Sequence, residues 1–201
     1  MKISIITATH NIKYMDRVWE SVKRQTFSDW EWIIVNDGSD DVCRWYNEKK
    51  QEFDKKNIWK IDIGRNRGRF GLYARNVGSM CASNKFIAFL DNDNEWEADH
   101  LESLAKKYIE TGKTPYCWMH IKGKKEGSTH DKIKKTHFGK QGIDLGCILW
   151  TKDLFESYGY FKDDSQVTFD WNCIARVYYN KGPNQFICTE NPSLIFWHKR
   201  Y

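Results

Sequence analysis

The stretch Phe86-Ile87-Ala88-Phe89-Leu90-Asp91-Asn92-Asp93 contains the pattern that decides the fold. Five apolar residues, a run of strand length, end at two carboxylates spaced i, i+2. A run without polar alternation is typical of a strand inside a parallel sheet that helices cover on both faces. We therefore predict a buried strand over 86–90 with a polar loop at its carboxyl end.

Three earlier strands are expected. Apolar runs of strand length occur at 3–6 and 32–35, and a further strand is predicted at 58–63. Helices are predicted over 16–25, 42–56, 72–82 and 97–110. The alternation predicts an α/β fold, a Rossmann-like domain with a mainly parallel central sheet and helices on both faces. The third helix is expected to bury Leu72, Val77, Met80 and Cys81.

The regular alternation ends near residue 112. Strands are predicted at 116–121, 145–150 and 194–197, and helices at 152–158 and 170–180. Residues 122–142 hold seven lysines, two histidines and four glycines among few apolar residues, which predicts a mobile loop. This loop is either a solvated basic face or a lid or acceptor-contact segment.

Length and charge narrow the class of protein. The 201 residues fit one domain, and no linker rich in Pro, Ser or Gly divides them. The net charge of +5 favours an anionic partner such as a nucleotide diphosphate, a nucleic acid or an acidic membrane face. We expect no nucleic-acid function, because the sequence has no RNP-type strand or basic recognition helix and the cluster at 91–99 is acidic.

Cysteine usage and hydropathy indicate the compartment. The six cysteines form no C-x-x-C pair, which argues against a zinc finger or ribbon, and we expect reduced thiols buried among apolar residues. The N-terminal apolar run is too short for a signal peptide, and no stretch approaches the ~20 apolar residues of a membrane span. The expected location is the cytoplasm, with attachment to a membrane surface left open.

Polar clusters follow three of the predicted strands, at residues 7–11, 36–41 and 91–93. Ligands of open α/β sheets bind beyond the carboxyl ends of the strands, so these clusters mark one candidate site. Asp91 and Asp93 can both face a hard divalent cation that also bridges to substrate phosphates. The alternative interpretation is a solvated turn.

Two neighbouring features also have a functional and a structural interpretation. Asp37 either forms an Asx-turn with its own backbone or accepts hydrogen bonds from a base or ribose. The loop 64–71 contains three arginines but matches neither the G-x-G-x-x-G fingerprint nor the P-loop. Its flexible backbone and guanidinium groups suit a phosphate neighbourhood, and a solvated basic loop is the alternative.

Ordered sequence blocks add a family resemblance to this pattern. They are Ile3-Ser4-Ile5-Ile6-Thr7-Ala8-Thr9-His10-Asn11, Ser21-Val22-x-x-Gln25-Thr26-Phe27-x-Asp29-Trp30-Glu31 with Ile33-Ile34-Val35-Asn36-Asp37-Gly38-Ser39-x-Asp41, Asn66-x-Gly68, Ala74-Arg75-Asn76-x-Gly78 and Phe89-Leu90-Asp91-Asn92-Asp93. In this order they resemble family 2 glycosyltransferases of the GT-A fold. Tyr158-Gly159-Tyr160-Phe161 followed by Phe169-Asp170 is similar to the family's Gly-x-Phe…Glu-Asp region. The sequence departs from the family where 68–74 is longer than usual and where Phe169 replaces an acidic residue.

The resemblance implies roles for the matching positions. The nucleotide sugar would be bound by Thr7, Ala8, Thr9, Asp37, Gly68, Arg75, Asp91 and Asn92. Asp93 would be the principal ligand of Mn²⁺ or Mg²⁺, with Asp91 and His198 as further metal ligands. Asp170 would be the catalytic base, and Asp163 and Asp164 are its nearby competitors.

The implied activity is metal-dependent, inverting transfer of a sugar from a nucleotide-diphosphate donor to an acceptor hydroxyl of a glycan or glycoconjugate. UDP is the favoured nucleotide, and GDP and dTDP remain alternatives. Residues 1–112 would form the nucleotide-sugar half of a single domain (1–201), and residues 113–201 the half that holds the acceptor and the base. A nucleotidyltransferase and a non-catalytic nucleotide- or glycan-binding domain are the competing interpretations.

Overall fold

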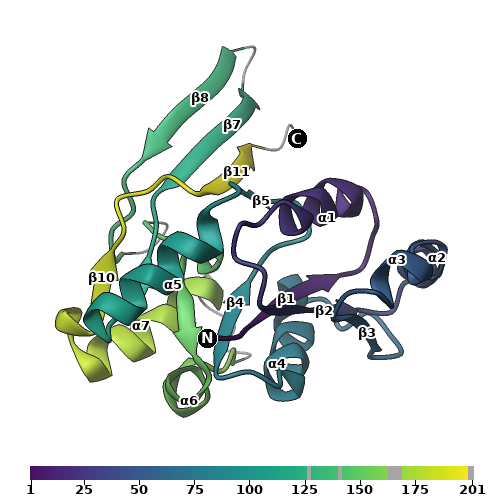
Figure 1. The fold of residues 1–201 in the computed structure, drawn as a ribbon, viewed down its shortest axis with the longest axis horizontal. Coiled ribbons are helices and arrows are strands. Elements are labelled where there is room, and N and C mark those ends of the chain that lie inside the picture. The colour runs from purple at the N-terminus through teal and green to yellow at the C-terminus, as the bar shows by residue number, and fades with distance from the viewer. Residues whose placement is uncertain (126–127, 140–141, 163–168, 199–201) are drawn as a thin grey trace.

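The central sheet has the strand order β3-β2-β1-β4-β9 in a computed structural model that describes residues 1–125, 128–139, 142–162 and 169–198 (Figure 1). Its strands are β1 (Ile3–Thr9), β2 (Trp30–Asn36), β3 (Ile58–Asp62), β4 (Phe86–Phe89) and β9 (Leu149–Thr151). The first four strands are parallel, and β9 runs antiparallel to β4. The predicted α/β fold with a mainly parallel sheet is confirmed.

Helices α1 (Met15–Lys23) and α4 (Leu72–Cys81) cover the two faces of this sheet. The other α-helices of the described ranges are α2 (Asp40–Glu48), α3 (Lys50–Phe53), α5 (His100–Thr111), α6 (Lys152–Leu154) and α7 (Phe169–Lys181). Successive side chains of β2 point to opposite faces. Trp32 stacks on Trp19 of α1 with ring centroids 5.6 Å apart, whereas a Cβ on Gly78 of α4 would lie 3.0 Å from Val35. Because Trp32 and Val35 are three residues apart in one strand, α1 and α4 lie on opposite faces.

Helix α4 presents a different face to the sheet than the sequence predicts. Met80 is 64% exposed and Cys81 is also exposed, so the prediction that both are buried is wrong. The helix approaches the sheet through Gly78, where a Cβ would come within 2.5 Å of Ile6. Residue 80 lies about 200° around the helix from residue 78, which directs Met80 to solvent.

A second sheet, of order β5-β11-β7-β8, stands beside the first. Its strands are β5 (Glu95–Trp96), β11 (Leu194–His198), β7 (Met119–Lys125) and β8 (Ser128–Lys134). The antiparallel β7–β8 hairpin overturns the prediction of a mobile loop over 122–134. Met119 and Ile121 at the start of β7 are buried, but the rest of the hairpin is largely polar and is held by the backbone ladder, so its composition concealed the strand structure.

The remaining segments of the second half are short. β6 (Thr114–Tyr116) and β10 (Phe186–Cys188) form a parallel pair. The predicted strand at 145–150 is largely wrong, because Leu145–Cys147 is a 3-10 turn in which the Asp144 carboxylate accepts from the Gly146 N–H at 2.8 Å. The predicted helix at 152–158 is present as α6 followed by a π-helical turn over Phe155–Gly159.

All six thiols are free in the structure. Cys117, Cys147 and Cys173 are buried as expected, whereas Cys43 and Cys188 are half-buried. Among the helices of the described ranges, none combines the length and the hydropathy needed to cross a bilayer.

Candidate active site

The three polar clusters meet at the carboxyl edge, the end of the central sheet where β1, β2 and β4 finish. The Asp37 N–H donates to the Thr9 carbonyl at 2.7 Å, and Asn92 Nδ2 donates to Thr9 Oγ1 at 3.0 Å. Because β1 lies between β2 and β4, Thr9 connects the ends of all three strands. The predicted convergence of the clusters at one edge is confirmed.

The arginine loop, residues 64–71, packs directly against the end of β2. The Arg67 N–H donates to Asp37 Oδ1 at 2.9 Å. Gly38 has a φ of +75°, and a Cβ at this position would lie 2.3 Å from the Asn66 nitrogen. Only glycine therefore allows the two backbones to approach this closely while keeping a left-handed conformation. This contact brings Gly68 and the guanidinium-bearing loop to the carboxyl edge.

Arg75 of α4 connects the arginine loop to the turn after β4. Its side chain is 9% exposed; Nη1 donates to the Phe70 carbonyl at 2.6 Å and Nη2 to Asp91 Oδ1 at 2.5 Å. Arg69 and Phe70 have φ values of 53° and 52°, a left-handed backbone that costs free energy for residues other than glycine. Strained backbone beside a charged cluster is typical of binding sites.

Ala8 also lies against the arginine loop. A Cβ on Gly71 would be 3.1 Å from the Cβ of Ala8, and Gly71 has a φ of +75°. Thr7, by contrast, is fully buried, and its hydroxyl accepts from Trp32 Nε1 at 2.9 Å. Of the predicted donor-binding residues of β1, Ala8 and Thr9 thus face the carboxyl edge, while the Thr7 side chain lies within the core.

The turn that carries Asp93 is fixed by α1. Arg17 Nη2 donates to the Asp93 carbonyl at 2.8 Å, and Arg17 Nε lies 2.9 Å from Glu95 Oε1. Trp197 of β11 donates through Nε1 to the same Glu95 oxygen at 2.7 Å, and the Arg17 guanidinium stands 4.6 Å from the Trp197 ring. This network ties the turn after β4 to the end of β11, the strand that finishes at His198.

The predicted residues of the acceptor side are described only in part. Asp170 is the second residue of α7 and His198 is the last of β11, and the structure describes the backbone of both. Asp163 and Asp164 lie outside the described residues. No group of three His, Cys, Asp or Glu side chains within the described ranges is arranged to hold a metal ion.

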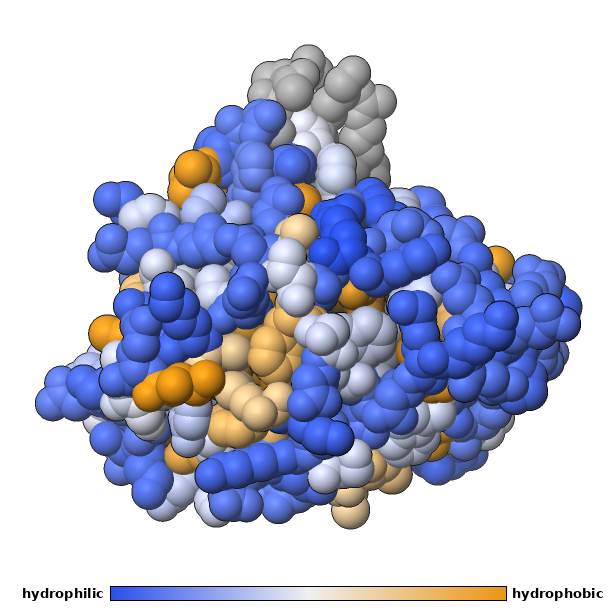
Figure 2. Space-filling view, viewed as in Figure 1, coloured by the Kyte–Doolittle hydropathy of each residue, from blue (hydrophilic) through white to orange (hydrophobic). Residues whose placement is uncertain are grey.

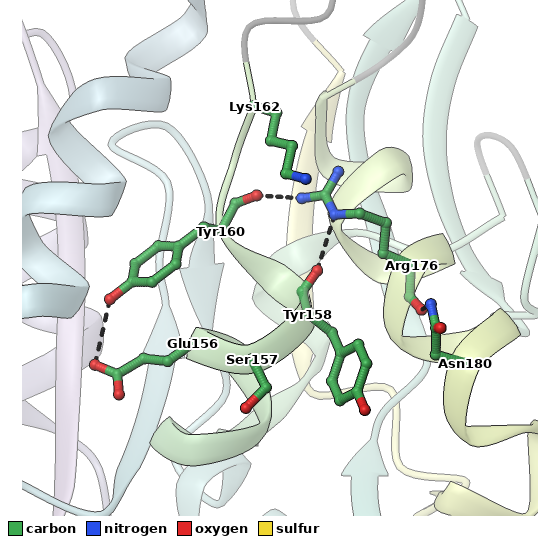
Figure 3. Close-up of a pocket in the computed structure, with 7 residues that line it drawn as sticks. All are labelled: Glu156, Ser157, Tyr158, Tyr160, Lys162, Arg176 and Asn180. Atoms are coloured by element: carbon green, nitrogen blue, oxygen red, sulfur yellow. Dashed lines mark hydrogen bonds between the residues drawn. The ribbon is translucent and has the colours of Figure 1, made fainter.

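The segment before α7 is anchored from two sides. Asn76 Nδ2 donates to the Phe161 carbonyl at 2.8 Å, and the Phe161 N–H donates to Asn76 Oδ1 at 3.0 Å. Arg176 of α7 donates through Nε to the Tyr158 carbonyl at 2.8 Å and through Nη2 to the Tyr160 carbonyl (Figure 3). Residues 158–161 are therefore held between α4 and α7.

Figure 3 also shows a shallow pocket beside this anchor. It has a volume of about 260 Å³ and is lined by Glu156, Ser157, Tyr158, Tyr160, Lys162, Arg176 and Asn180. Arg176 is occupied by the two backbone carbonyls, so its role visible here is to fasten α7 to the preceding segment.

Sequence reasoning missed Arg17, Asn76 and Arg176. Asn76 belongs to the Ala74-Arg75-Asn76 block, which contributes to the family resemblance but assigns no role to Asn76. Arg17 and Arg176 sit within helical stretches of ordinary composition, and their partners are far away in the sequence, so no local pattern marks them.

Comparisons with known proteins agree with this geometry. The family model "Glycosyl transferase family 2" matches residues 4–177. The uncharacterized glycosyltransferase YwdF of Bacillus subtilis is 29% identical over 189 residues, which cover 88% of this chain and 68% of that protein. The UDP-Glc:alpha-D-GlcNAc-diphosphoundecaprenol beta-1,3-glucosyltransferase WfgD of Escherichia coli is 36% identical over 101 residues, 50% of this chain and 38% of that protein.

A solved structure supports the fold. S. aureus TarS 1–349 in complex with UDP-GlcNAc superposes with a TM-score of 0.77 at 19% identity, over 100% of this chain and 60% of that one. This chain thus spans about three fifths of the length of the solved neighbour. The match over most of the chain to the family model and the shared GT-A architecture lead to one conclusion: the chain belongs to glycosyl transferase family 2.

Proposed function

We propose that the protein transfers a sugar from a nucleoside-diphosphate donor, with UDP as the preferred nucleotide, to a hydroxyl of a glycan or glycoconjugate with inversion at the anomeric carbon. The observation that carries the proposal is the convergence of Thr9, Asp37 and Asp91 at one sheet edge within a family 2 domain. The neighbour TarS was solved with UDP-GlcNAc, and the name of WfgD specifies UDP-Glc, which supports a UDP-sugar donor.

The donor would lie along the carboxyl edge. Asp37 would accept hydrogen bonds from the base or ribose, next to Ala8 and Thr9. Arg75 and the backbone at Gly68 would lie near the diphosphate, where a guanidinium and N–H groups suit phosphate oxygens. Asn92 is held by Thr9 and would contact the nucleotide sugar.

The residues after β4 fit a hard divalent cation. Asp91 and Asp93 supply carboxylate oxygens, the donors that Mg²⁺ and Mn²⁺ prefer, two residues apart on one turn. Two carboxylates leave room for phosphate oxygens and water, and His198 is the candidate for a further ligand. When bound, the ion would neutralise charge on the departing diphosphate. The hydrogen bond from Arg75 Nη2 to Asp91 Oδ1 orients this carboxylate.

Asp170 would act as the base. As a carboxylate it takes the proton of the acceptor hydroxyl while the hydroxyl oxygen bonds to the anomeric carbon and the bond from that carbon to the diphosphate oxygen breaks. Asp163→Asn and Asp164→Asn are the comparison variants. Full transfer by Asp170→Asn, together with loss of transfer by either comparison variant, would move the base to that residue.

The test is thermal unfolding with UDP, GDP, CDP and dTDP, each with and without Mn²⁺. At a ligand concentration of about 100 times Kd we expect a rise in Tm of roughly 5–10 °C for UDP with Mn²⁺. The rise should vanish in Asp93→Ala. It should persist in Asp29→Ala, because Asp29 is an exposed carboxylate near Lys2 and away from the site.

A Tm shift that needs neither Mn²⁺ nor Asp93 would contradict the proposed metal dependence. The absence of a Tm shift with every nucleotide would contradict the proposed donor site. Release of pyrophosphate instead of nucleoside diphosphate would indicate a nucleotidyltransferase.

A further inference from the structure

Most of the net positive charge of the chain comes from one element. The name basic hairpin is used here for residues 119–135, which are β7, β8, the two residues between them and Lys135. They contain six lysines and two acidic residues, a net charge of +4 where the whole chain carries +5. The other 184 residues are therefore almost neutral in sum, and the hairpin dominates the long-range field of the molecule.

The basic hairpin is continuous with the candidate active site. β5 begins two residues after Asp93, β11 pairs with both β5 and β7, and β8 is the outer strand. The register places His198 opposite Gly123, so β7 continues past the end of β11. Figure 1 shows the hairpin projecting from the body on the side where the described part of β11 ends. A strand of seven residues is ~23 Å long, enough to guide an extended chain.

The acidic side chains near the hairpin are already engaged. Asp131 is hydrogen-bonded to His120, and Glu97 lies 3.7 Å from the Lys122 ammonium. Lys132 and Lys135 are exposed, and the Lys135 ammonium stands 4.9 Å from the centre of the Trp118 ring. The indole face positions this exposed ammonium group on the surface.

The same surface is poorly suited to insertion into a bilayer. Ile133 is 57% exposed and is the one large apolar side chain of the hairpin's described part that is more than half exposed. The visible face of the hairpin is mostly hydrophilic in Figure 2. Interfacial segments usually combine basic residues with several apolar ones that enter the acyl boundary.

We propose that the basic hairpin binds an anionic acceptor, a glycan chain that carries phosphodiester or carboxylate groups, and guides its end to the carboxyl edge. The inference rests on the proposed transferase function and specifies the class of acceptor. Lys132 and Lys135 contact the repeated anionic groups. The continuity of the second sheet with the Asp93 turn places the bound chain next to the site of transfer.

The experiment compares a double variant, Lys132→Gln with Lys135→Gln, with a control that loses the same charge from exposed lysines elsewhere, Lys55→Gln with Lys106→Gln. Binding is measured to long-chain polyphosphate and to polygalacturonate, with neutral dextran as the uncharged reference. We expect the wild-type protein to bind at least one polyanion and not dextran, with affinity that falls as salt rises. The hairpin variant should bind that polyanion about tenfold more weakly, and the control less than twofold. The polyanion that binds identifies phosphate or carboxylate as the recognised group.

Several outcomes would overturn the inference. Equal losses of affinity in the hairpin variant and the control would mean that only the total charge matters. The absence of binding to either polyanion would contradict an anionic acceptor. Hairpin-dependent binding that is stronger to single-stranded DNA, or to vesicles of phosphatidylcholine and phosphatidylglycerol, would assign the surface to a different partner. The Tm shift with UDP and Mn²⁺, recorded for the same proteins, should be unchanged in both variants. Its absence from the wild-type protein would contradict the proposed function independently of the hairpin.

Discussion

The side-chain amide of Asn76 forms two reciprocal hydrogen bonds with the peptide groups of Phe161, at 2.8 and 3.0 Å. The preceding residue of α4, Arg75, stands 5.6 Å from the Phe161 ring and bonds to Asp91. One turn of α4 therefore contacts both the turn after β4 and the segment that leads to α7. The spacing between the two halves of the candidate site depends on this helix.

The first prediction concerns this pair. Asn76→Ala removes both hydrogen bonds and leaves a partly buried peptide N–H and C=O without their partner, which should lower the free energy of unfolding by about 2 kcal/mol. Asn180→Ala is the matched control, because Asn180 Nδ2 donates to the Arg176 carbonyl on an exposed surface, where the loss should stay below about 0.5 kcal/mol. Urea denaturation measures both, and equal small losses would show that the Asn76 pair contributes little.

The second prediction uses two glycines with the same backbone conformation. Gly38 and Gly64 have φ values of +75° and +78°, but a Cβ on Gly38 would collide with the arginine loop and one on Gly64 would meet nothing within 4 Å. Gly64→Ala should cost about 1 kcal/mol from the left-handed conformation alone. Gly38→Ala should cost about 3 kcal/mol or more and abolish the Tm shift with UDP and Mn²⁺, because Arg67 must leave Asp37.

Calorimetry with and without nucleotide separates the two glycine variants. If Gly38→Ala keeps the nucleotide-dependent shift of the wild-type protein, the close approach of the arginine loop to β2 is not needed for donor binding. Gly64→Ala should keep that shift in either case.

The strands and the carboxyl edge were predictable because they depend on local sequence. The apolar run 86–90 and its polar end are signals over a few residues, and the parallel sheet then brings Thr9, Asp37 and Asp91 together. The contacts that fix the site are different in kind. Arg17 meets Asp93 across 76 residues and Asn76 meets Phe161 across 85, so neither partner appears in the pattern around the other.

The β7–β8 hairpin of the second half was harder to predict because backbone pairing, more than side-chain hydropathy, holds its strands together. From Lys122 onward, β7 and β8 are rich in lysine and polar residues and carry little apolar signal, although their ladder is regular. The exposed Met80 shows the same limit for helices: its apolarity predicts burial, but the approach of Gly78 to Ile6 decides which face is buried.

The third prediction concerns the two hydrogen bonds that the Arg75 guanidinium donates. Arg75→Lys replaces two nitrogens that reach Phe70 and Asp91 separately with one ammonium, which cannot reproduce the planar geometry. The left-handed backbone at Arg69 and Phe70 should then relax. Trypsin should cleave after Arg69 several times faster than in the wild-type protein, as mass spectrometry of timed digests would show.

Arg44→Lys is the control for this change, because Arg44 is paired with Asp41 on an exposed helix turn and away from the arginine loop. Its digestion pattern around residue 69 should match the wild-type protein. Unchanged cleavage in Arg75→Lys would mean that the loop holds its conformation without the guanidinium.

The fourth prediction is a pH dependence at Glu31, a carboxylate of β2 that is 2% exposed. Burial raises its pKa, but hydrogen bonds from Ser4, Ser83 and Trp59 outweigh this effect and hold the pKa below its usual value of 4.5. The carboxylate therefore contributes stability above about pH 4.5 that is lost as the pH falls through the lower pKa of the folded state.

The variant Glu31→Gln tests this contribution. Trp59 Nε1 donates to Glu31 Oε2 at 3.2 Å, and in the variant this donor would face the N–H₂ group of the new amide. The free energy of unfolding should fall by about 2 kcal/mol at pH 7. Urea denaturation at pH 7 and pH 3 should show this difference shrinking in acid, because below about pH 4.5 the unfolded state takes up a proton that the folded carboxylate binds less readily. The exposed Glu48→Gln should be close to neutral at pH 7, and a Glu31→Gln effect that is equal at both pH values would contradict the role of the buried charge.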